Sequence, residues 1–360
     1  MNRFQIAVFA CIQVVSFGAL NADDSQVRKA MIDKSVAFLR SSQAEDGSFS
    51  STTGPGVTGL VTSGLLSAGV PESDPIVAKS LRYLEGTRHD DGGLYAPQSR
   101  HANYETCLAM MAFSKANSDG RYSEMIQRAE KFVKQQQWDE GEGLTSDDPA
   151  YGGAGYGSKS RPDLSNTTFL IDALRSAGCS EEDEAIQRAL AFVSKCQNLE
   201  SPANRTPFAP LINDGGFYYT PAAGGESFAG KDPNGGLRSY ASMTYAGLKS
   251  MIFAGVEKDD YRVKAAKNFL YNNYSVTSNP GMGTSGLYYY HQTMAKALDA
   301  LGEREFQTKD GPRDWKSDLI KQLSSTQQSN GSWTNTDARW MEGDPNLVTG
   351  YVLLTLSFLK

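Results

Sequence analysis

The sequence is poor in cysteine and histidine and has no excess of basic charge. Its 360 residues include four cysteines and three histidines, and the formal net charge is −6. The charges are spread along the chain without the basic patch that nucleic acid or an anionic membrane surface requires. Nucleic acid is therefore not an expected partner.

The few cysteines do not suggest a disulfide framework. Cys11 lies in the apolar N-terminal segment, which leaves Cys107, Cys179 and Cys196. A predicted helix over 183–194 would hold Cys179 and Cys196 roughly 25 Å apart, which is too far for a disulfide. Cys107 lies in an apolar run and is expected to be a small buried residue. We expect no catalytic thiol.

Long apolar runs are also scarce, and the longest lies at the N-terminus. Arg3 precedes an apolar run over 6–20, and Ala22 follows it before two aspartates. The run is too short to span a bilayer and is typical of a secretory signal peptide. We predict a signal peptide over 1–22, a single domain over 23–360, and a secreted or periplasmic protein that does not span the membrane.

A repeat runs through the rest of the chain. Six times an apolar stretch is followed by a glycine-rich turn and a second apolar stretch. The turns are Asp46-Gly47-Ser48-Phe49, Asp91-Gly92-Gly93-Leu94, Tyr151-Gly152-Gly153, Asp214-Gly215-Gly216-Phe217, Gly286-Leu287-Tyr288 and Asn330-Gly331-Ser332-Trp333. A threonine stands near the start of each second stretch: Thr58, Thr106, Thr167, Thr244, Thr293 and Thr349. Self-similarity of this kind indicates one structural unit, copied and stacked.

Each unit has the pattern of two helices. The first stretch is amphipathic, as in 189–193, whereas the second is almost continuously apolar, as in 108–113 and 351–356. A helix that is apolar on all sides is buried. The pattern predicts an all-α protein, an α/α toroid of about six helix pairs with an inner apolar ring inside an outer amphipathic ring.

Proline and glycine gather in three segments between the predicted helices, and none of them resembles an interdomain linker. They are 141–163, 198–238 and 274–287. Inserts of this length are usually functional or mobile. They are expected on the turn side of the ring, where the inner helices begin.

Two of the turns have sequences that resemble the repeats of a known family. Phe38-x4-Gln43-x3-Gly47-x-Phe49 and Gln327-Gln328-Ser329-Asn330-Gly331-Ser332-Trp333 resemble the glutamine-tryptophan repeats of squalene cyclases and of protein prenyltransferase β subunits. The resemblance extends from about residue 30 to the end and implies a bacterial, secreted member of the terpenoid cyclase/protein prenyltransferase α/α-toroid superfamily. Each glutamine is expected to bond exposed amides of the next helix, and the aromatic residue to pack over it.

The cyclase branch of this family uses an Asp-x-Asp-Asp-Thr-Ala stretch whose middle aspartate protonates the substrate. The matching segment here is Asp163-Leu164-Ser165-Asn166-Thr167-Thr168. Asp163 matches the first aspartate of that stretch, but Ser165 replaces the middle aspartate, which is the proton donor. A hydroxyl is far too weak an acid to protonate an alkene, so the known cyclase mechanism is not expected.

The other two branches also lack their reactive groups. Prenyltransferase β subunits bind zinc through an Asp-x-Cys pair and a histidine. Tyr290-His291-Gln292-Thr293 resembles the histidine segment, but the chain contains no Asp-x-Cys. The complement-like thioester needs a glutamine three residues after the cysteine, and Cys179-Ser180-Glu181-Glu182 lacks it. We predict no metal site and no cofactor.

Polar residues at the starts of the inner helices should still converge on one cavity. The candidate catalytic residues are Glu105, Asp163, Arg238 and His291. The candidate ligand-binding residues are Tyr104, Ser165, Asn166, Tyr240, Tyr290 and Asn346. Taken singly, several of them also fit helix capping, but a concave site with convergent polar groups is the default ligand site.

Two functions remain open at this point. The first is a secreted enzyme that uses the cavity, either isoprenoid-related with altered acid chemistry or similar to a polysaccharide lyase. The second is a non-catalytic toroid that binds an apolar, glycan or peptide ligand. Loss of the cyclase and prenyltransferase signatures favours the second, whereas the resemblance to an enzyme superfamily favours the first.

Overall fold

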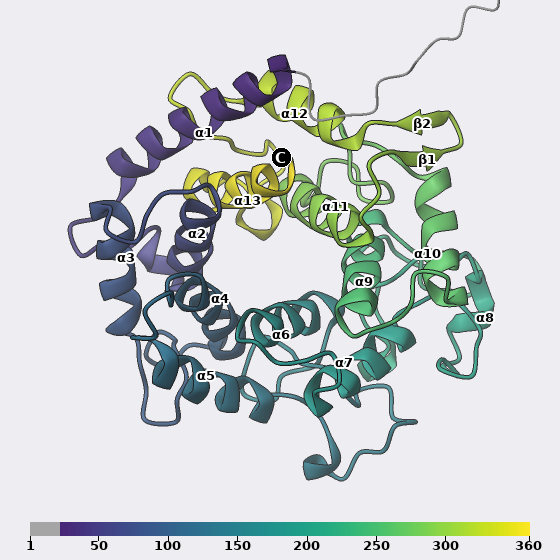
Figure 1. Ribbon diagram of the computed structural model, residues 1–360. Helices are drawn as coiled ribbons and strands as arrows, with labels where there is room; N and C mark the ends of the chain where they lie inside the picture. The colour runs from purple at the N-terminus through teal and green to yellow at the C-terminus, as the bar shows by residue number, and fades with distance from the viewer. Residues whose placement is uncertain (1–21) are drawn as a thin grey trace, which may run out of the picture.

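The computed structural model describes residues 22–360, which form a ring of six helix pairs (Figure 1). The outer helices are α1 (Ala22–Ser42), α3 (Pro75–Glu85), α5 (Ser123–Gln135), α7 (Glu184–Lys195), α10 (Tyr261–Asn272) and α12 (Trp315–Thr326). The inner helices are α2 (Gly56–Ser67), α4 (Ala102–Lys115), α6 (Leu164–Ser176), α9 (Ala241–Phe253), α11 (Leu287–Leu301) and α13 (Pro345–Phe358). The predicted α/α toroid is confirmed. The predicted signal peptide lies outside the described residues, except for Ala22, where α1 begins.

Four of the six repeated threonines attach a turn to its inner helix. Five of the six stand nine residues before the last residue of their helix, and Thr293 stands eight before it. The Thr58 hydroxyl accepts the amide of Phe49 at 2.9 Å, and Thr106, Thr167 and Thr244 accept the corresponding turn amides at 3.0 Å. The threonine thus satisfies a buried turn amide that would otherwise be unpaired.

Turn glycines and glutamines join neighbouring helix pairs. Gly47 has a φ of +92°, and a Cβ there would lie 2.4 Å from the carbonyl oxygen of Lys79 on the next outer helix. The Gln43 side chain donates from Nε2 to the carbonyls of Gly47 and Ile76 at 3.1 and 2.8 Å. Gln137, Gln197 and Gln327 make the same pair of contacts. The expectation that these glutamines bond helix amides is therefore wrong, because they donate to carbonyls.

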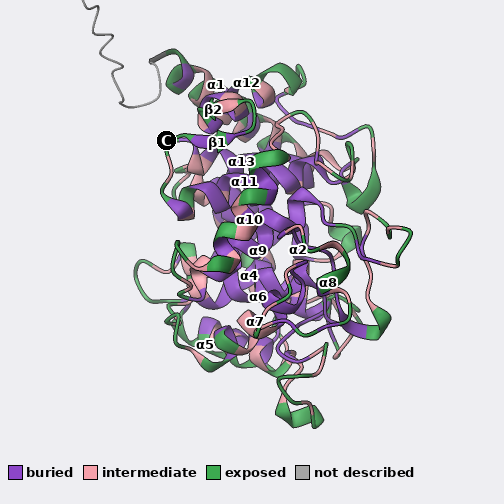
Figure 2. Ribbon diagram, turned by 90° about the vertical axis from the view of Figure 1, so that its right-hand side faces the viewer, coloured by how far each residue is buried: buried purple, intermediate pink, exposed green. Residues whose placement is uncertain are grey.

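The two rings differ in burial as their sequences predict. Most residues of α2, α9 and α13 are buried, whereas α5 and α7 bury only the face that packs on the inner ring (Figure 2). α13 packs on α2, and α1 packs on α12 and α13, so the ring closes between its first and last helix pairs. Arg28 Nε donates to the carbonyl of Leu356 at 2.7 Å across this junction.

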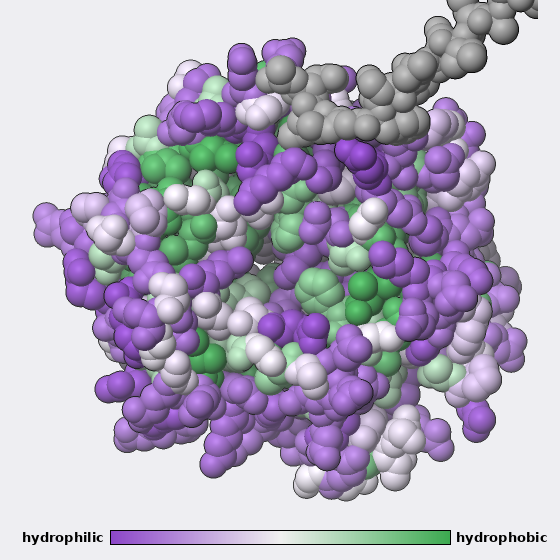
Figure 3. All heavy atoms as spheres, viewed as in Figure 1, coloured by the Kyte–Doolittle hydropathy of each residue, from purple (hydrophilic) through white to green (hydrophobic). Residues whose placement is uncertain are grey.

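A buried cluster of charges joins three inner helices. Asp172 of α6 pairs with Lys249 of α9 at 2.7 Å and with Lys296 of α11 at 2.8 Å. Burial raises the pKa of Asp172, but the two ammonium groups outweigh it and hold that pKa below its ordinary value. These residues lie in the C-terminal halves of their helices. Figure 3 shows the face where the inner helices end, which is mostly hydrophilic and hollowed at its centre.

The structure adds elements that the sequence pattern did not predict. A hairpin of β1 (Phe306–Thr308) and β2 (Gly311–Arg313), with Phe306 opposite Arg313, connects α11 to α12. The shorter helices are η1 (Ser51–Thr53), η2 (Glu140–Glu142), α8 (Ala209–Ile212), η3 (Ala222–Gly224) and η4 (Arg339–Met341). From Ala22 onward, no helix combines the length and the apolar character needed to cross a bilayer.

Candidate functional site

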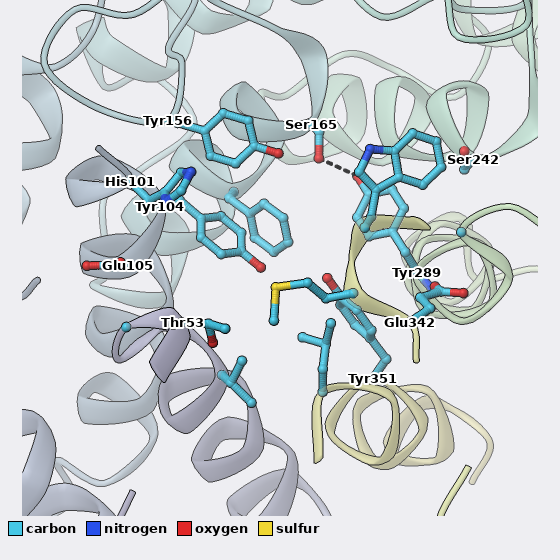
Figure 4. Close-up of a pocket in the computed structure, with 18 of the residues that line it drawn as sticks. Thr53, His101, Tyr104, Glu105, Tyr156, Ser165, Ser242, Tyr289, Glu342 and Tyr351 are labelled. Atoms are coloured by element: carbon cyan, nitrogen blue, oxygen red, sulfur yellow. Dashed lines mark hydrogen bonds between the residues drawn. The ribbon is translucent and has the colours of Figure 1, made fainter. Parts of the chain in front are cut away.

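A cavity of about 590 Å³ lies where the inner helices begin. Its walls are largely aromatic, and Figure 4 shows four tyrosines that point toward the same space from different elements. The aromatic lining consists of Tyr104, Tyr156, Phe169, Tyr219, Phe228, Tyr240, Tyr289, Trp340 and Tyr351. All three long inserts contribute to the wall, through Tyr156, through Tyr219 and Phe228, and through Asn279. The inserts are thus part of the site.

The polar groups on the inner-helix walls are mostly hydroxyls. Ser165 donates its hydroxyl proton to the Tyr289 oxygen at 3.1 Å (Figure 4). The Tyr289 ring packs against Phe169 and Tyr351, with centroids 6.3 and 6.0 Å apart. Burial raises the pKa of Tyr289 well above its ordinary value, so its phenol is neutral at physiological pH.

Glu105 of α4 is one of two carboxyls that line the cavity. It is buried, and it accepts hydrogen bonds from the amide of Ala96 and the hydroxyl of Ser99, both at 2.9 Å. Burial raises the pKa of Glu105, although these two hydrogen bonds favour the charged form and lower it. Because both oxygens are engaged by the loop before α4, Glu105 holds that loop in place at the cavity wall.

Glu342 is the second carboxyl, and it is not among the site residues predicted from the sequence. Its Oε1 accepts the amides of Tyr288 and Tyr289 at 2.9 and 2.8 Å, and its Oε2 accepts the Asn335 side-chain amide at 2.7 Å. Burial raises the pKa of Glu342, although these hydrogen bonds favour the charged form and lower it. Glu342 therefore caps the N-terminus of α11 from a distant segment, which favours a negative charge there.

Asp163 is the N-cap of α6 and lies behind the cavity wall. Its carboxyl accepts the backbone amide of Asn166 at 2.8 Å and the Asn166 side-chain amide at 2.7 Å. The hydroxyl of Tyr219, which lines the cavity, also bonds this carboxyl. Burial outweighs these bonds and raises the pKa of Asp163 to about 6.

This raised pKa predicts a pH-dependent stability. Because the pKa is higher in the folded state than in the unfolded state, folding takes up a proton between about pH 4 and 6. Asp163 contributes about 2 to 3 kcal/mol to the free energy of unfolding. This contribution is fully present below pH 4 and is lost as the pH rises through 6. Asp163→Asn keeps an amide oxygen as the cap and should remove this dependence. Urea unfolding at pH 4, 5, 6 and 7 measures the free energy of unfolding of both proteins. If that free energy changes with pH equally in wild type and in Asp163→Asn, the prediction is wrong.

The structure brings four of the ten predicted site residues to the cavity. They are Tyr104, Glu105, Ser165 and Tyr240. Asp163 reaches the cavity only through Tyr219, and Asn166 is buried against Asp163.

The other four predicted residues lie elsewhere. Arg238 is exposed and donates from Nε to the carbonyl of Lys231 at 3.1 Å. Tyr290 and His291 are buried and bond the carbonyls of residues 275 and 276 at 2.6 and 2.8 Å. Burial lowers the pKa of His291 to about 4, so the ring is neutral. Asn346 bonds two serines at the junction of the first and last helix pairs.

A loop over residues 335–342, here named the mouth loop, forms one edge of the cavity. Trp340 and Met341 line the cavity, are each 40% exposed, and have φ values of 54° and 64°. Such left-handed conformations cost about 1–3 kcal/mol per residue outside glycine. Arg339 lies over the Trp340 ring at 4.3 Å and over the ring of Phe228 at 4.9 Å.

One cluster in the described part of the chain has the composition of a metal site. Glu130, Cys179 and Asp183 bring three possible ligand atoms together. Lys134 Nζ pairs with both carboxylates at 2.7 Å. An ammonium group therefore already satisfies the charge of this cluster, which lies on the outer ring away from the cavity.

Comparison with known proteins finds the same ring fold. The family model for the squalene-hopene cyclase C-terminal domain matches residues 53–210. A type II terpene cyclase from Scytonema, solved with its product merosterolic acid A, superposes with a TM-score of 0.58 at 12% identity. The match covers 94% of this chain and 99% of that one. The chain thus resembles the squalene-hopene cyclase C-terminal domain over residues 53–210 and shares the fold of the terpene cyclase.

The toroid also resembles carbohydrate-active proteins in fold. A glycosyl hydrolase family 88 protein from Bacteroides vulgatus has a TM-score of 0.58 at 9% identity, over 93% of this chain and 98% of that one. A glycoside hydrolase family 76 mannosidase from Bacteroides thetaiotaomicron has a TM-score of 0.54 at 11% identity, over 91% and 98%. No curated protein sequence matches the chain.

Proposed function

We propose that this toroid binds an extended apolar ligand of the isoprenoid class in its central cavity, outside the cytoplasm. The observation that carries the proposal is the aromatic lining of the cavity. Nine aromatic side chains form its walls, and concave apolar sites with a few polar groups are the usual ligand sites. The Scytonema relative was solved with a merosterolic acid, which supports the same ligand class.

The polar groups of the cavity support binding more than acid catalysis. Glu105 and Glu342 are engaged by loop and helix donors that stabilise their charged forms. Ser165 occupies the position of the proton donor in the cyclases and bonds Tyr289. The other polar groups that line the cavity are hydroxyls, the Asn279 amide, His101 and Arg100. None of these is a carboxylic acid of the kind that protonates an alkene.

Thermal unfolding of the full chain with geranylgeraniol and with squalene tests this function. A ligand that binds only the folded state should stabilise it by about 2.7 kcal/mol at a hundredfold excess over its Kd. Ser165→Phe, which places a ring in the cavity, should abolish the shift, whereas Ser165→Ala should keep it. Arg238→Ala, at an exposed residue outside the cavity, should also keep it. An unchanged melting temperature with both isoprenoids would contradict the proposal.

A glycan is the second candidate ligand. The cavity combines aromatic rings with hydroxyls such as those of Ser165 and Ser242, a combination that also suits sugar rings, and two of the similar folds belong to glycoside hydrolases. Mannotriose in the same thermal assay separates the two ligands. A shift with mannotriose alone, lost in Ser165→Phe, would favour the glycan-binding function.

A further inference from the structure

We infer that Phe228 and Trp340 form a gate across the mouth of the cavity, which opens by movement of the mouth-loop tip, residues 336–341. The inference rests on the proposed function, because it concerns how a ligand reaches the same cavity. Phe228 belongs to the 198–238 insert and Trp340 to the mouth loop, and their rings pack with centroids 5.3 Å apart. Both line the cavity.

The base of the mouth loop is fixed. Asn335 and Glu342 join its two ends, with the Asn335 amide donating to the Glu342 carbonyl at 2.7 Å and their side chains paired at 2.7 Å. Asn335 also donates to the carbonyl of Thr284 at 2.7 Å. Because Glu342 caps α11 as well, the base cannot move without uncapping an inner helix.

The tip is held differently. Its cavity-facing residues, Trp340 and Met341, are both left-handed and partly exposed. Trp340 rests on Phe228 and on Gly286, where a Cβ would lie 3.2 Å from the Trp340 ring. The Arg339 guanidinium covers the two gate rings from outside.

The balance of forces at the tip permits two states. Two left-handed non-glycine residues store strain comparable in size to the gain from one aromatic pair and its cation–π contacts. Opening would release the strain but lose the stacking and the hydrogen bond from the Ser285 hydroxyl to Asp337. The closed state is therefore the major one, and opening is transient. A fixed base, a strained tip and a ring-to-ring contact are the parts of a gate.

Binding kinetics separate a gate from an ordinary wall contact. The probe is cis-parinaric acid, an apolar polyene whose fluorescence rises in an apolar site, mixed with the full chain by stopped flow. Phe228→Ala should raise both the association and the dissociation rate by about fivefold, with little change in Kd. Trp340→Phe keeps a smaller ring at the gate and should raise both rates by less than Phe228→Ala does. Tyr271→Ala, at an exposed tyrosine on α10, is the surface control.

An association rate of Phe228→Ala within twofold of wild type would overturn the gate, even if the dissociation rate rises. If the probe does not bind the wild type, the proposed function fails. The gate is then tested independently by hydrogen exchange. Without any ligand, amides of 336–341 should exchange about fivefold faster in Phe228→Ala than in wild type. Equal exchange rates would overturn it.

Discussion

Replacement of Asp172 by asparagine is expected to destabilise the toroid by about 3–5 kcal/mol, because it leaves buried ammonium groups without a counter-ion. Lys249 is 2% exposed and receives its charge-balancing contact from Asp172. Without that carboxylate, burial lowers the pKa of Lys249 further below its unfolded value. Stability of the variant should therefore recover in part as pH rises from 7 to 9, because the unfolded state then binds more protons than the folded state.

Urea unfolding at pH 7 and pH 9 measures this effect. Asp33→Asn is the matched control, because Asp33 makes an exposed pair with Lys29 at 2.6 Å and such pairs contribute less than about 1 kcal/mol. The triple variant Asp172→Leu with Lys249→Met and Lys296→Met should regain most of the lost stability. It leaves neither ammonium group without its partner, and apolar residues often replace buried ion pairs without cost. If Asp172→Asn lowers the free energy of unfolding no more than Asp33→Asn does, the charged cluster is not desolvated.

Gly152→Ala should destabilise the protein by about 2–5 kcal/mol. Two costs add there: Gly152 has a φ of +82°, and a Cβ would lie 1.8 Å from the carbonyl oxygen of Arg188. The conformational cost is about 1–2 kcal/mol, and separating two packed backbones costs about 1–3 kcal/mol more. The shift would also disturb the contact of Gln137 with the Gly152 carbonyl at 2.8 Å.

Gly143→Ala isolates the first of these costs. Gly143 belongs to the same insert and has a φ of +76°, but among the described residues no atom lies within 4 Å of its added Cβ. It should lose only about 1–2 kcal/mol. Equal losses for the two variants in chemical unfolding would mean that the close approach at Gly152 relaxes freely.

The fold could be predicted from the sequence because the same local physics is repeated six times. The threonine register and the turn glycines recur whatever the intervening loop length, so Thr58 and Thr244 identify equivalent positions although their inserts differ. The β1–β2 hairpin occurs once in the described chain and has no repeat to reveal it.

The site could be predicted only in part. The starts of the inner helices located Glu105 and Ser165, but a run of polar residues on one helix does not tell which of them faces inward. Successive residues point about 100° apart, so Tyr289 lines the cavity while His291 is turned toward residue 276. Glu342 joins the site through contacts with amides more than fifty residues earlier, which no local pattern contains.

The closure of the ring has a consequence for the order in which the protein can be made. α2, one of the first inner helices to be synthesised, packs on α13, which is synthesised last. Its apolar surface therefore stays open until nearly the whole chain has left the ribosome. Contacts between the two ends of a chain form slowly and expose intermediates to aggregation. A truncated chain without 345–358 should consequently remain dependent on chaperones, however well its first five helix pairs have formed.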